Sequence, residues 1–136
     1  MLDLILCVDD DPITLMLCKM VIAKSSFATE IITAQNGEEA LNYFDDLKLN
    51  NLGAEIKKYP SLVFLDLNMP VMDGWEFLDH FSKEEYTSAF KNTKVIVLSS
   101  TIDPNDIEKS KTYPMVLDFL SKPITKEIVE NLKERL

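Results

Sequence analysis

Polar side chains that could accept or bind a phosphoryl group lie where apolar segments of this chain end. They are the carboxylates of Asp9, Asp10 and Asp66, the hydroxyl group of Ser99 and the ammonium group of Lys122. Carboxylates that lie close together repel one another, so they stay ionised together at neutral pH only with a cation among them. Mg²⁺ is the expected ion, because it prefers oxygen ligands and is commonly held by one or two carboxylates and phosphate oxygens. No His or Cys belongs to this set, which disfavours zinc.

Together, these residue types indicate chemistry at phosphorus. A carboxylate beside Mg²⁺ can attack a phosphoryl group, and the product would be an aspartyl phosphate. Lys122 would pair with one phosphoryl oxygen, Ser99 would donate a hydrogen bond to a second, and the metal would hold the third. Taken singly, the acid run Asp9–Asp11 is more often solvated surface, and a lone Lys or Ser means little. The prediction rests on their coincidence at strand ends of one sheet.

Five strands alternating with helices are expected to position these residues. The expected strands are Leu4–Val8, Glu30–Ala34, Leu62–Leu67, Lys94–Leu98 and Asp118–Leu120. The expected helices start at the capping residues Asp11, Asn36 and Asp103, and the one capped by Asn36 is expected to run through Phe44. Two more helices are expected over Trp75–Phe81 and Thr125–Leu136. This alternation predicts an α/β fold, a doubly wound five-stranded parallel sheet with helices on both faces. Ligands of such sheets bind at the carboxyl ends of the strands.

The first helix is expected to bury one apolar face against the sheet. Its members recur at helical spacing and are Ile13, Leu17, Met20 and Val21. Cys7 and Cys18 lie among apolar neighbours with no further cysteine nearby, and they are expected to be buried thiols rather than metal ligands.

Length and charge narrow the function further. A chain of 136 residues is long enough for one domain, expected over residues 1–136, and too short for a second of ordinary size. The net charge of -9 disfavours nucleic acid as a partner, because phosphate backbones are held by clustered Lys and Arg. No signal peptide or membrane span is visible, so we expect a cytoplasmic protein without a membrane partner.

Four sequence segments resemble the receiver domains of two-component response regulators, the family that includes the chemotaxis response regulators. They are Val8-Asp9-Asp10, the stretch Leu65-Asp66-Leu67-Asn68-Met69-Pro70-Val71-Met72-Asp73-Gly74, then Leu98-Ser99-Ser100 and Lys122-Pro123. The second segment matches the phosphoacceptor motif of the family almost letter for letter, and the four together span nearly the whole chain. The resemblance implies the flavodoxin-like strand order 2-1-3-4-5.

The resemblance also implies roles for single residues. Asp66 would accept a phosphoryl group from a histidine kinase or a histidine phosphotransfer protein. Asp10, Asp66 and the main-chain carbonyl of Asn68 would bind Mg²⁺, with Asp9 acting through water. Ser99 and Phe119 would form the switch pair. Output would then pass through the face made by the fourth helix, the fifth strand and the fifth helix to a downstream protein, which makes the chain a signalling switch rather than an enzyme.

Some features depart from the family pattern or allow other functions. Ser99 and Ser100 stand where Thr and a smaller residue are commoner, and Leu47–Pro60 is longer than many members need. A phosphohydrolase of the haloacid dehalogenase type would use Asp9 and Asp11, but it would leave the Asp66 segment unexplained. A degenerate receiver, acting as a constitutive interaction module, is the other alternative, because sequence alone cannot show that phosphorylation is used.

Overall fold

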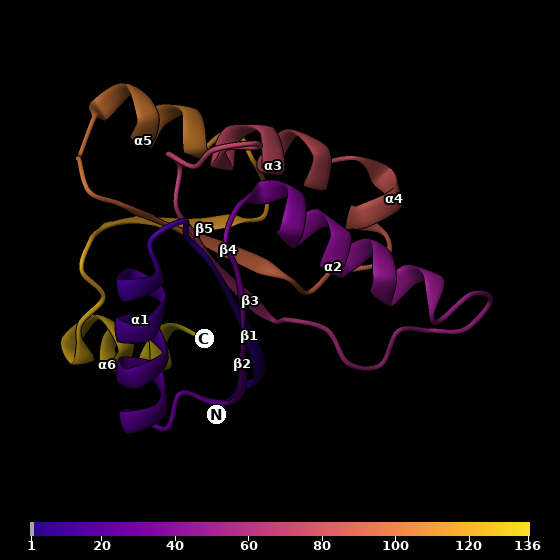
Figure 1. Ribbon diagram of the computed structural model, residues 1–136, viewed down its shortest axis with the longest axis horizontal. Coiled ribbons are helices and arrows are strands. Elements are labelled where there is room, and N and C mark those ends of the chain that lie inside the picture. The colour runs from indigo at the N-terminus through magenta and orange to yellow at the C-terminus, as the bar shows by residue number, and fades with distance from the viewer. Residues whose placement is uncertain (1) are drawn as a thin grey trace.

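The structure is a computed structural model that describes residues 2–136, and Figure 1 shows its arrangement of strands and helices. The strands are β1 (Leu2–Val8), β2 (Ala28–Ala34), β3 (Leu62–Leu65), β4 (Lys94–Ser99) and β5 (Val116–Ser121). The helices are α1 (Pro12–Lys24), α2 (Gly37–Leu49), α3 (Gly74–Phe81), α4 (Glu84–Thr87), α5 (Pro104–Ser110) and α6 (Lys126–Arg135). All five expected strands are confirmed.

The strands form one parallel sheet in the order β2-β1-β3-β4-β5, which confirms the predicted fold class and strand order. The register aligns Val8 with Leu65, and Leu65 with Val97. Strands β1 and β3 therefore end side by side, and β4 continues two residues further, to Ser99. Because the three strands are parallel, this register brings the loops after β1, β3 and β4 to one edge of the sheet.

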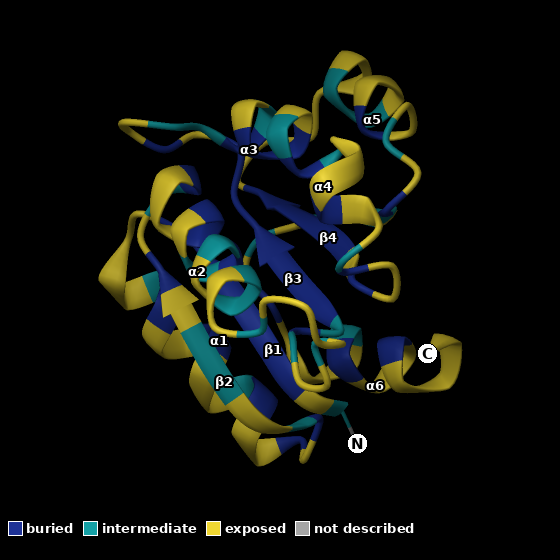
Figure 2. Ribbon diagram, turned by 90° about the vertical axis from the view of Figure 1, so that its right-hand side faces the viewer, coloured by how far each residue is buried: buried dark blue, intermediate teal, exposed yellow. Residues whose placement is uncertain are grey.

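Helices cover both faces of the sheet and create two separate cores. Helices α1 and α6 lie on one face, and α2, α3, α4 and α5 lie on the other (Figure 1). The first core packs aliphatic side chains such as Leu15 and Ile22 of α1 against the sheet. The second is rich in aromatic rings, including Phe44, Phe77 and Phe81. Figure 2 shows that β1, β3 and β4 are buried, whereas β2 lies at an exposed edge.

Helix starts follow the capping chemistry expected from sequence. The side chains of Asp11, Asn36 and Asp103 each accept a hydrogen bond from a backbone N–H in the first turn of their helix. At α3, Asp73 and Glu76 form a reciprocal capping box. These caps fix where the helices begin, directly after the loops that carry the polar residues.

The predicted buried face of α1 is wrong for three of its four residues. Ile13, Leu17 and Met20 are exposed, whereas Val21 is half-buried against the core, and the buried residues of the helix are Leu15, Cys18 and Ile22. The helix is apolar on nearly every side, so hydrophobic spacing alone could not select the face that meets the sheet. Burial of both thiols, Cys7 and Cys18, is confirmed.

Two further differences concern helices. The short helix α4 was not expected, and α2 continues to Leu49 rather than ending at Phe44. Tyr86 of α4 is buried in the aromatic core, so packing stabilises a helix too short to form alone. Within residues 2–136 we find no helical segment with the length and apolar character needed to cross a bilayer.

Candidate functional site

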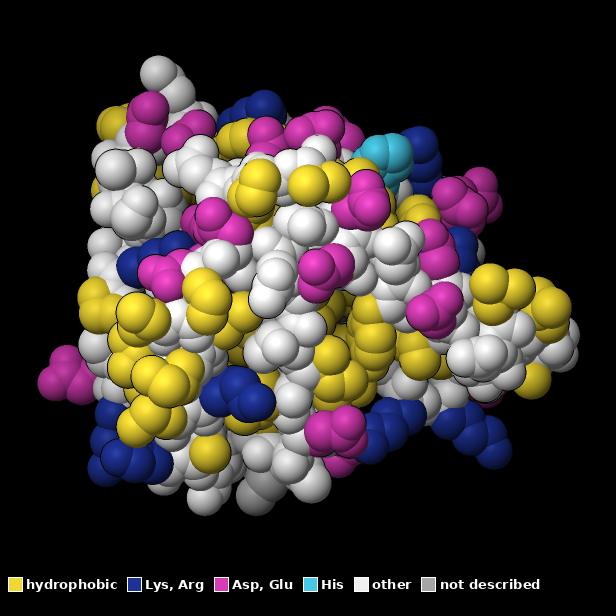
Figure 3. Space-filling model, in the orientation of Figure 1, with side chains coloured by type: hydrophobic (Ala, Val, Ile, Leu, Met, Phe, Trp, Pro, Cys, Tyr) yellow, Lys and Arg dark blue, Asp and Glu magenta, His cyan; other side chains and the backbone are white. Residues whose placement is uncertain are grey.

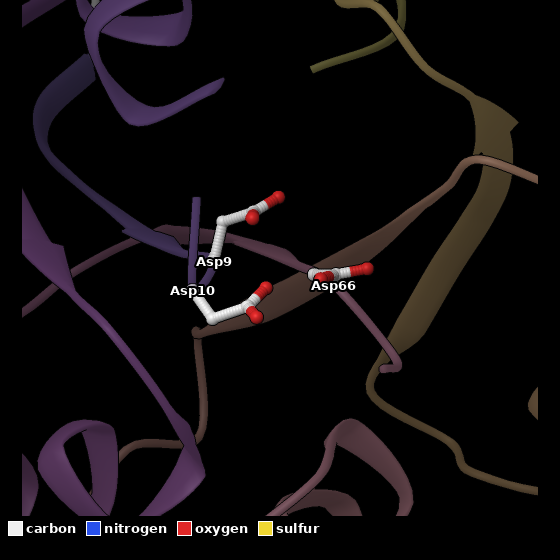
Figure 4. A group of neighbouring side chains, drawn as sticks. All are labelled: Asp9, Asp10 and Asp66. Atoms are coloured by element: carbon white, nitrogen blue, oxygen red, sulfur yellow. The ribbon is translucent and has the colours of Figure 1, made fainter. Parts of the chain in front are cut away.

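Three carboxylates converge where β1 and β3 end. Asp9 and Asp10 extend from the loop after β1, and Asp66 follows β3 (Figure 4). One carboxylate oxygen from each residue lies within 4.8 Å of the other two. Asp9 and Asp66 are buried and Asp10 is exposed, so the cluster is open to solvent on the Asp10 side.

Lys122 completes the cluster from the end of β5. Its Nζ lies 2.6 Å from Asp9 Oδ2 and 3.3 Å from Asp66 Oδ1. The backbone N–H of Lys122 donates a 2.8 Å hydrogen bond to the Ser99 carbonyl, which ties the loop after β5 to the end of β4. The following Lys122–Pro123 peptide bond is cis. The four charged residues predicted from distant parts of the sequence thus lie together in the fold.

The charges in this cluster change one another's protonation. Burial, together with the nearby charge of Asp9, raises the pKa of Asp66, while Lys122 and the N–H of Asn68 oppose that rise. Burial lowers the pKa of Lys122, but its contacts with Asp9 and Asp66 outweigh this effect and raise the pKa overall. The ammonium ion therefore compensates part of the negative charge, and a cation beside Asp10 would compensate more.

The donor set suits a hard divalent cation. Asp9, Asp10 and Asp66 offer only carboxylate oxygens, and Asp9 also has one oxygen engaged by the backbone N–H of Asp11 at 2.9 Å. Because Lys122 occupies the other oxygen of Asp9, the oxygens of Asp10 and Asp66 are the more available ligands. The residues present therefore fit Mg²⁺ better than a softer ion.

The segment from Asp66 to Gly74 is held tightly against the start of α3. A Cβ atom on Gly74 would lie 2.5 Å from the main-chain oxygen of Asp66, so only glycine allows this approach. The Gly74 N–H donates to the Leu67 carbonyl at 3.0 Å. Gly37 makes a similar approach to Met72, to whose carbonyl its N–H donates at 2.9 Å. The loop that carries Asp66 is therefore fixed on both sides.

The remaining predicted residues lie as follows. Ser99 is buried at the end of β4, and its hydroxyl oxygen accepts a 3.2 Å hydrogen bond from the Thr101 N–H. Phe119 is half-buried on β5, opposite Val97 in the sheet. Trp75 and His80 are both half-buried on α3.

A family model described as the response regulator receiver domain matches residues 5–133. The chain belongs to this family. It is thus a receiver domain of two-component response regulators, a signalling module.

Relatives of similar length agree with this assignment. The receiver chain is 30% identical over 135 residues to the probable methanogenesis regulatory protein FilR2 of Methanothrix harundinacea, covering 96% of this chain and 81% of FilR2. The crystal structure of a two-component response regulator from Cytophaga hutchinsonii is 30% identical, with a TM-score of 0.85 and coverage of 98% and 96% of the two chains. The chemotaxis response regulator CheY4 of Vibrio cholerae, 23% identical over 99% of this chain and 98% of its own, shares the fold with a TM-score of 0.74.

Other relatives are longer than this receiver domain. The probable C4-dicarboxylate response regulator DctR of Halalkalibacterium halodurans is 28% identical over 123 residues, which is 90% of this chain but 46% of DctR.

The sequence revealed the charged residues of the site through strand ends and motifs. It did not reveal the ion pair of Lys122 with Asp9, for which no local pattern exists, or the exposure of the apolar face of α1.

Proposed function

We propose that this receiver domain accepts a phosphoryl group on Asp66 from the phosphohistidine of a histidine kinase or a histidine phosphotransfer protein, in an Mg²⁺-dependent reaction. The observation that carries the proposal is the convergence of three carboxylates and Lys122 at one edge of the sheet. The family model, which spans residues 5–133, supports one receiver domain over residues 1–136, and we propose that this domain acts in the cytoplasm.

Each residue has a defined part in this reaction. An Asp66 carboxylate oxygen forms a bond to phosphorus as the phosphorus–nitrogen bond to the donor imidazole breaks, and the imidazole leaves with the bonding pair and takes up a proton. Asp10, Asp66 and the main-chain carbonyl of Asn68 would hold Mg²⁺, with Asp9 acting through water. The bound ion would neutralise charge on the phosphoryl oxygens. Lys122 is already 3.3 Å from Asp66 and would pair with a phosphoryl oxygen.

The phosphorylated domain would act as a switch and not as an enzyme that releases a product, although it supplies its own phosphotransfer and dephosphorylation chemistry. Incubation with acetyl phosphate and Mg²⁺, followed by intact-mass measurement, tests the proposal. We expect one added phosphoryl group per chain. An unchanged mass at saturating acetyl phosphate would instead favour a degenerate receiver.

The exposed side of α1 is a suitable docking surface for the phosphohistidine donor. Ile13, Met16, Leu17 and Met20 are exposed by 64%, 53%, 42% and 44%, and Figure 3 shows hydrophobic side chains gathered where Figure 1 places α1. The helix is capped by Asp11, so this apolar face continues directly from the Asp9–Asp10 side of the site. A donor protein must bring its imidazole to Asp66, and apolar contact beside the site would orient it.

Met16→Asp should slow phosphotransfer from a protein donor by about tenfold, because a charge would be buried in an apolar contact. Phosphorylation by acetyl phosphate should not change, since this small donor needs no docking surface. One rate is measured with a phosphorylated histidine kinase core, chosen as the fastest donor in a panel of such cores. The other rate is measured with acetyl phosphate. Leu52→Asp, at a position 78% exposed after α2, is the matched control. Equal protein-donor rates for the two variants would place the docking surface elsewhere.

The signal would leave the site through Ser99 and Phe119. A phosphoryl group on Asp66 offers new acceptor oxygens, so the Ser99 hydroxyl would turn to donate to one of them, and Phe119 would turn inward behind it. This movement would change the face made by α5, β5 and α6. These are the fourth expected helix, the fifth strand and the fifth expected helix, because the short helix α4 was not expected, and they form the proposed output surface for a downstream protein.

Fluorine NMR of labelled Phe119 tests this switch. The phosphoryl mimic beryllofluoride should move its resonance in the original protein. In Ser99→Ala the movement should be much smaller, although Asp66 would still be phosphorylated. Identical Phe119 resonances with and without beryllofluoride in the original protein would remove this residue from the mechanism.

A further inference from the structure

A cluster of side chains joins α3 to the C-terminal end of α5. The Trp75 and Tyr113 rings stack with their centroids 6.1 Å apart and their planes at 25°. Lys109 Nζ lies 4.4 Å from the centroid of the Trp75 ring. The Tyr113 hydroxyl donates a 2.5 Å hydrogen bond to Asp79, which is one turn after Trp75 on α3. Tyr113, just beyond α5, is therefore held to α3 at two points.

Helix α5 has few other attachments to the protein. Ser110 is the one residue of α5 that is buried, and Asp106 and Ile107 are half-buried. A helix that buries so little surface can shift at low cost in free energy. The contacts of Lys109 and Tyr113 with α3 are thus a main attachment of the C-terminal end of α5.

Contacts near both ends of α5 involve residues close to the phosphoacceptor Asp66. Before its N-terminal end, the Thr101 N–H donates to the hydroxyl oxygen of Ser99. At its C-terminal end, the cluster reaches Trp75, which directly follows Gly74, the residue packed on the main-chain oxygen of Asp66. If the Ser99 hydroxyl turned away, the loop before α5 would lose this hydrogen bond, whereas the cluster and the packing on β5 would still hold the C-terminal end of the helix.

We propose that Trp75, Asp79, Lys109 and Tyr113 form an α3–α5 clamp that holds α5 in the arrangement of the unphosphorylated protein and opposes the change at the output face. The clamp rests on the proposed function, because it acts on the response to phosphorylation of Asp66. Coupling between two sites is reciprocal. A weaker clamp should therefore make the phosphorylated arrangement easier to reach and strengthen binding of a phosphoryl mimic at Asp66.

The test compares two tyrosines whose hydroxyl groups each donate a hydrogen bond to an aspartate on a neighbouring helix. Tyr113→Phe removes the hydrogen bond to Asp79 and keeps the stacked ring. Tyr86→Phe is the matched control, because the Tyr86 hydroxyl donates to Asp45 at 2.7 Å and Lys48 Nζ lies 4.1 Å from its ring centroid, but these contacts join α4 to α2. Each variant is titrated with beryllofluoride in the presence of Mg²⁺, and occupancy is followed from the amide NMR signal of Gly74.

We expect the titration midpoint of Tyr113→Phe to fall about fivefold, the effect of one net hydrogen bond, while that of Tyr86→Phe stays at the original value. Lys109→Met, which removes the cation and keeps an apolar side chain, should shift the midpoint in the same direction as Tyr113→Phe. Unchanged or higher midpoints in both clamp variants would overturn the clamp while leaving phosphorylation of Asp66 intact. Absence of any beryllofluoride binding to the original protein would overturn the clamp and the proposed function together.

Discussion

Asp66→Asn will abolish the phosphoryl adduct and leave the protein folded and at least as stable as the original. The amide keeps the shape of the carboxylate but lacks the anionic oxygen that attacks phosphorus. The pKa of Asp66 is raised, first by burial and then by Asp9, so its ionised form costs folding free energy at neutral pH. A neutral side chain removes that cost. Intact mass after treatment with acetyl phosphate and Mg²⁺, and the thermal midpoint, measure the two effects.

The sign of the stability effect also predicts its pH dependence. A carboxyl group whose folded pKa is raised destabilises the fold above that pKa, and the destabilisation disappears as the pH falls below its unfolded value. The stability advantage of Asp66→Asn should therefore shrink on acidification. Asp103→Asn is the matched control, because Asn caps a helix as well as Asp and this cap lies outside the carboxylate cluster. It should be phosphorylated normally, and labelling of Asp66→Asn to the same extent would show that another residue is the acceptor.

The fold was largely predictable because its local signals agree with one another. Apolar runs of strand length, caps such as Asp11 and Asn36, and the alternation of strands with helices all specify the same parallel sheet. The charged residues of the candidate site were predictable for the same reason. A parallel sheet places the ends of its strands at one edge, so strand positions alone bring Asp9, Asp66 and Lys122 together.

Features decided by tertiary contact were not predictable from local sequence. Helix α1 has apolar residues around most of its circumference, and the choice of Leu15, Cys18 and Ile22 as its buried face depends on the shape of the sheet. Helix α4 exists because Tyr86 fills the aromatic core, a contact between segments distant in sequence. The same limit applies to the contact of Trp75 with Tyr113, which joins two segments that look unremarkable in isolation.

Mg²⁺ will stabilise the original protein, and Asp10→Ala will remove most of this response. Three carboxylates with oxygens within 4.8 Å of one another repel, and an ion that binds the folded state alone raises the free energy of unfolding. Loss of the Asp10 ligand should weaken Mg²⁺ binding by about tenfold or more, because losing a group that only supports a metal ligand already has an effect of that size. Phosphorylation by acetyl phosphate should fall in parallel, and a chelator should abolish it in the original protein.

The order of the thermal midpoints separates metal binding from a general effect of the mutation. Without Mg²⁺, Asp10→Ala should be at least as stable as the original protein, because it removes one of three repelling charges. With saturating Mg²⁺ the order should reverse, because the original protein gains the binding free energy and the variant gains little. Asp46→Ala, an exposed position on α2, should respond to Mg²⁺ as the original does. Phosphorylation that persists in the chelator, or a full Mg²⁺ response in Asp10→Ala, would remove this carboxylate cluster from metal binding.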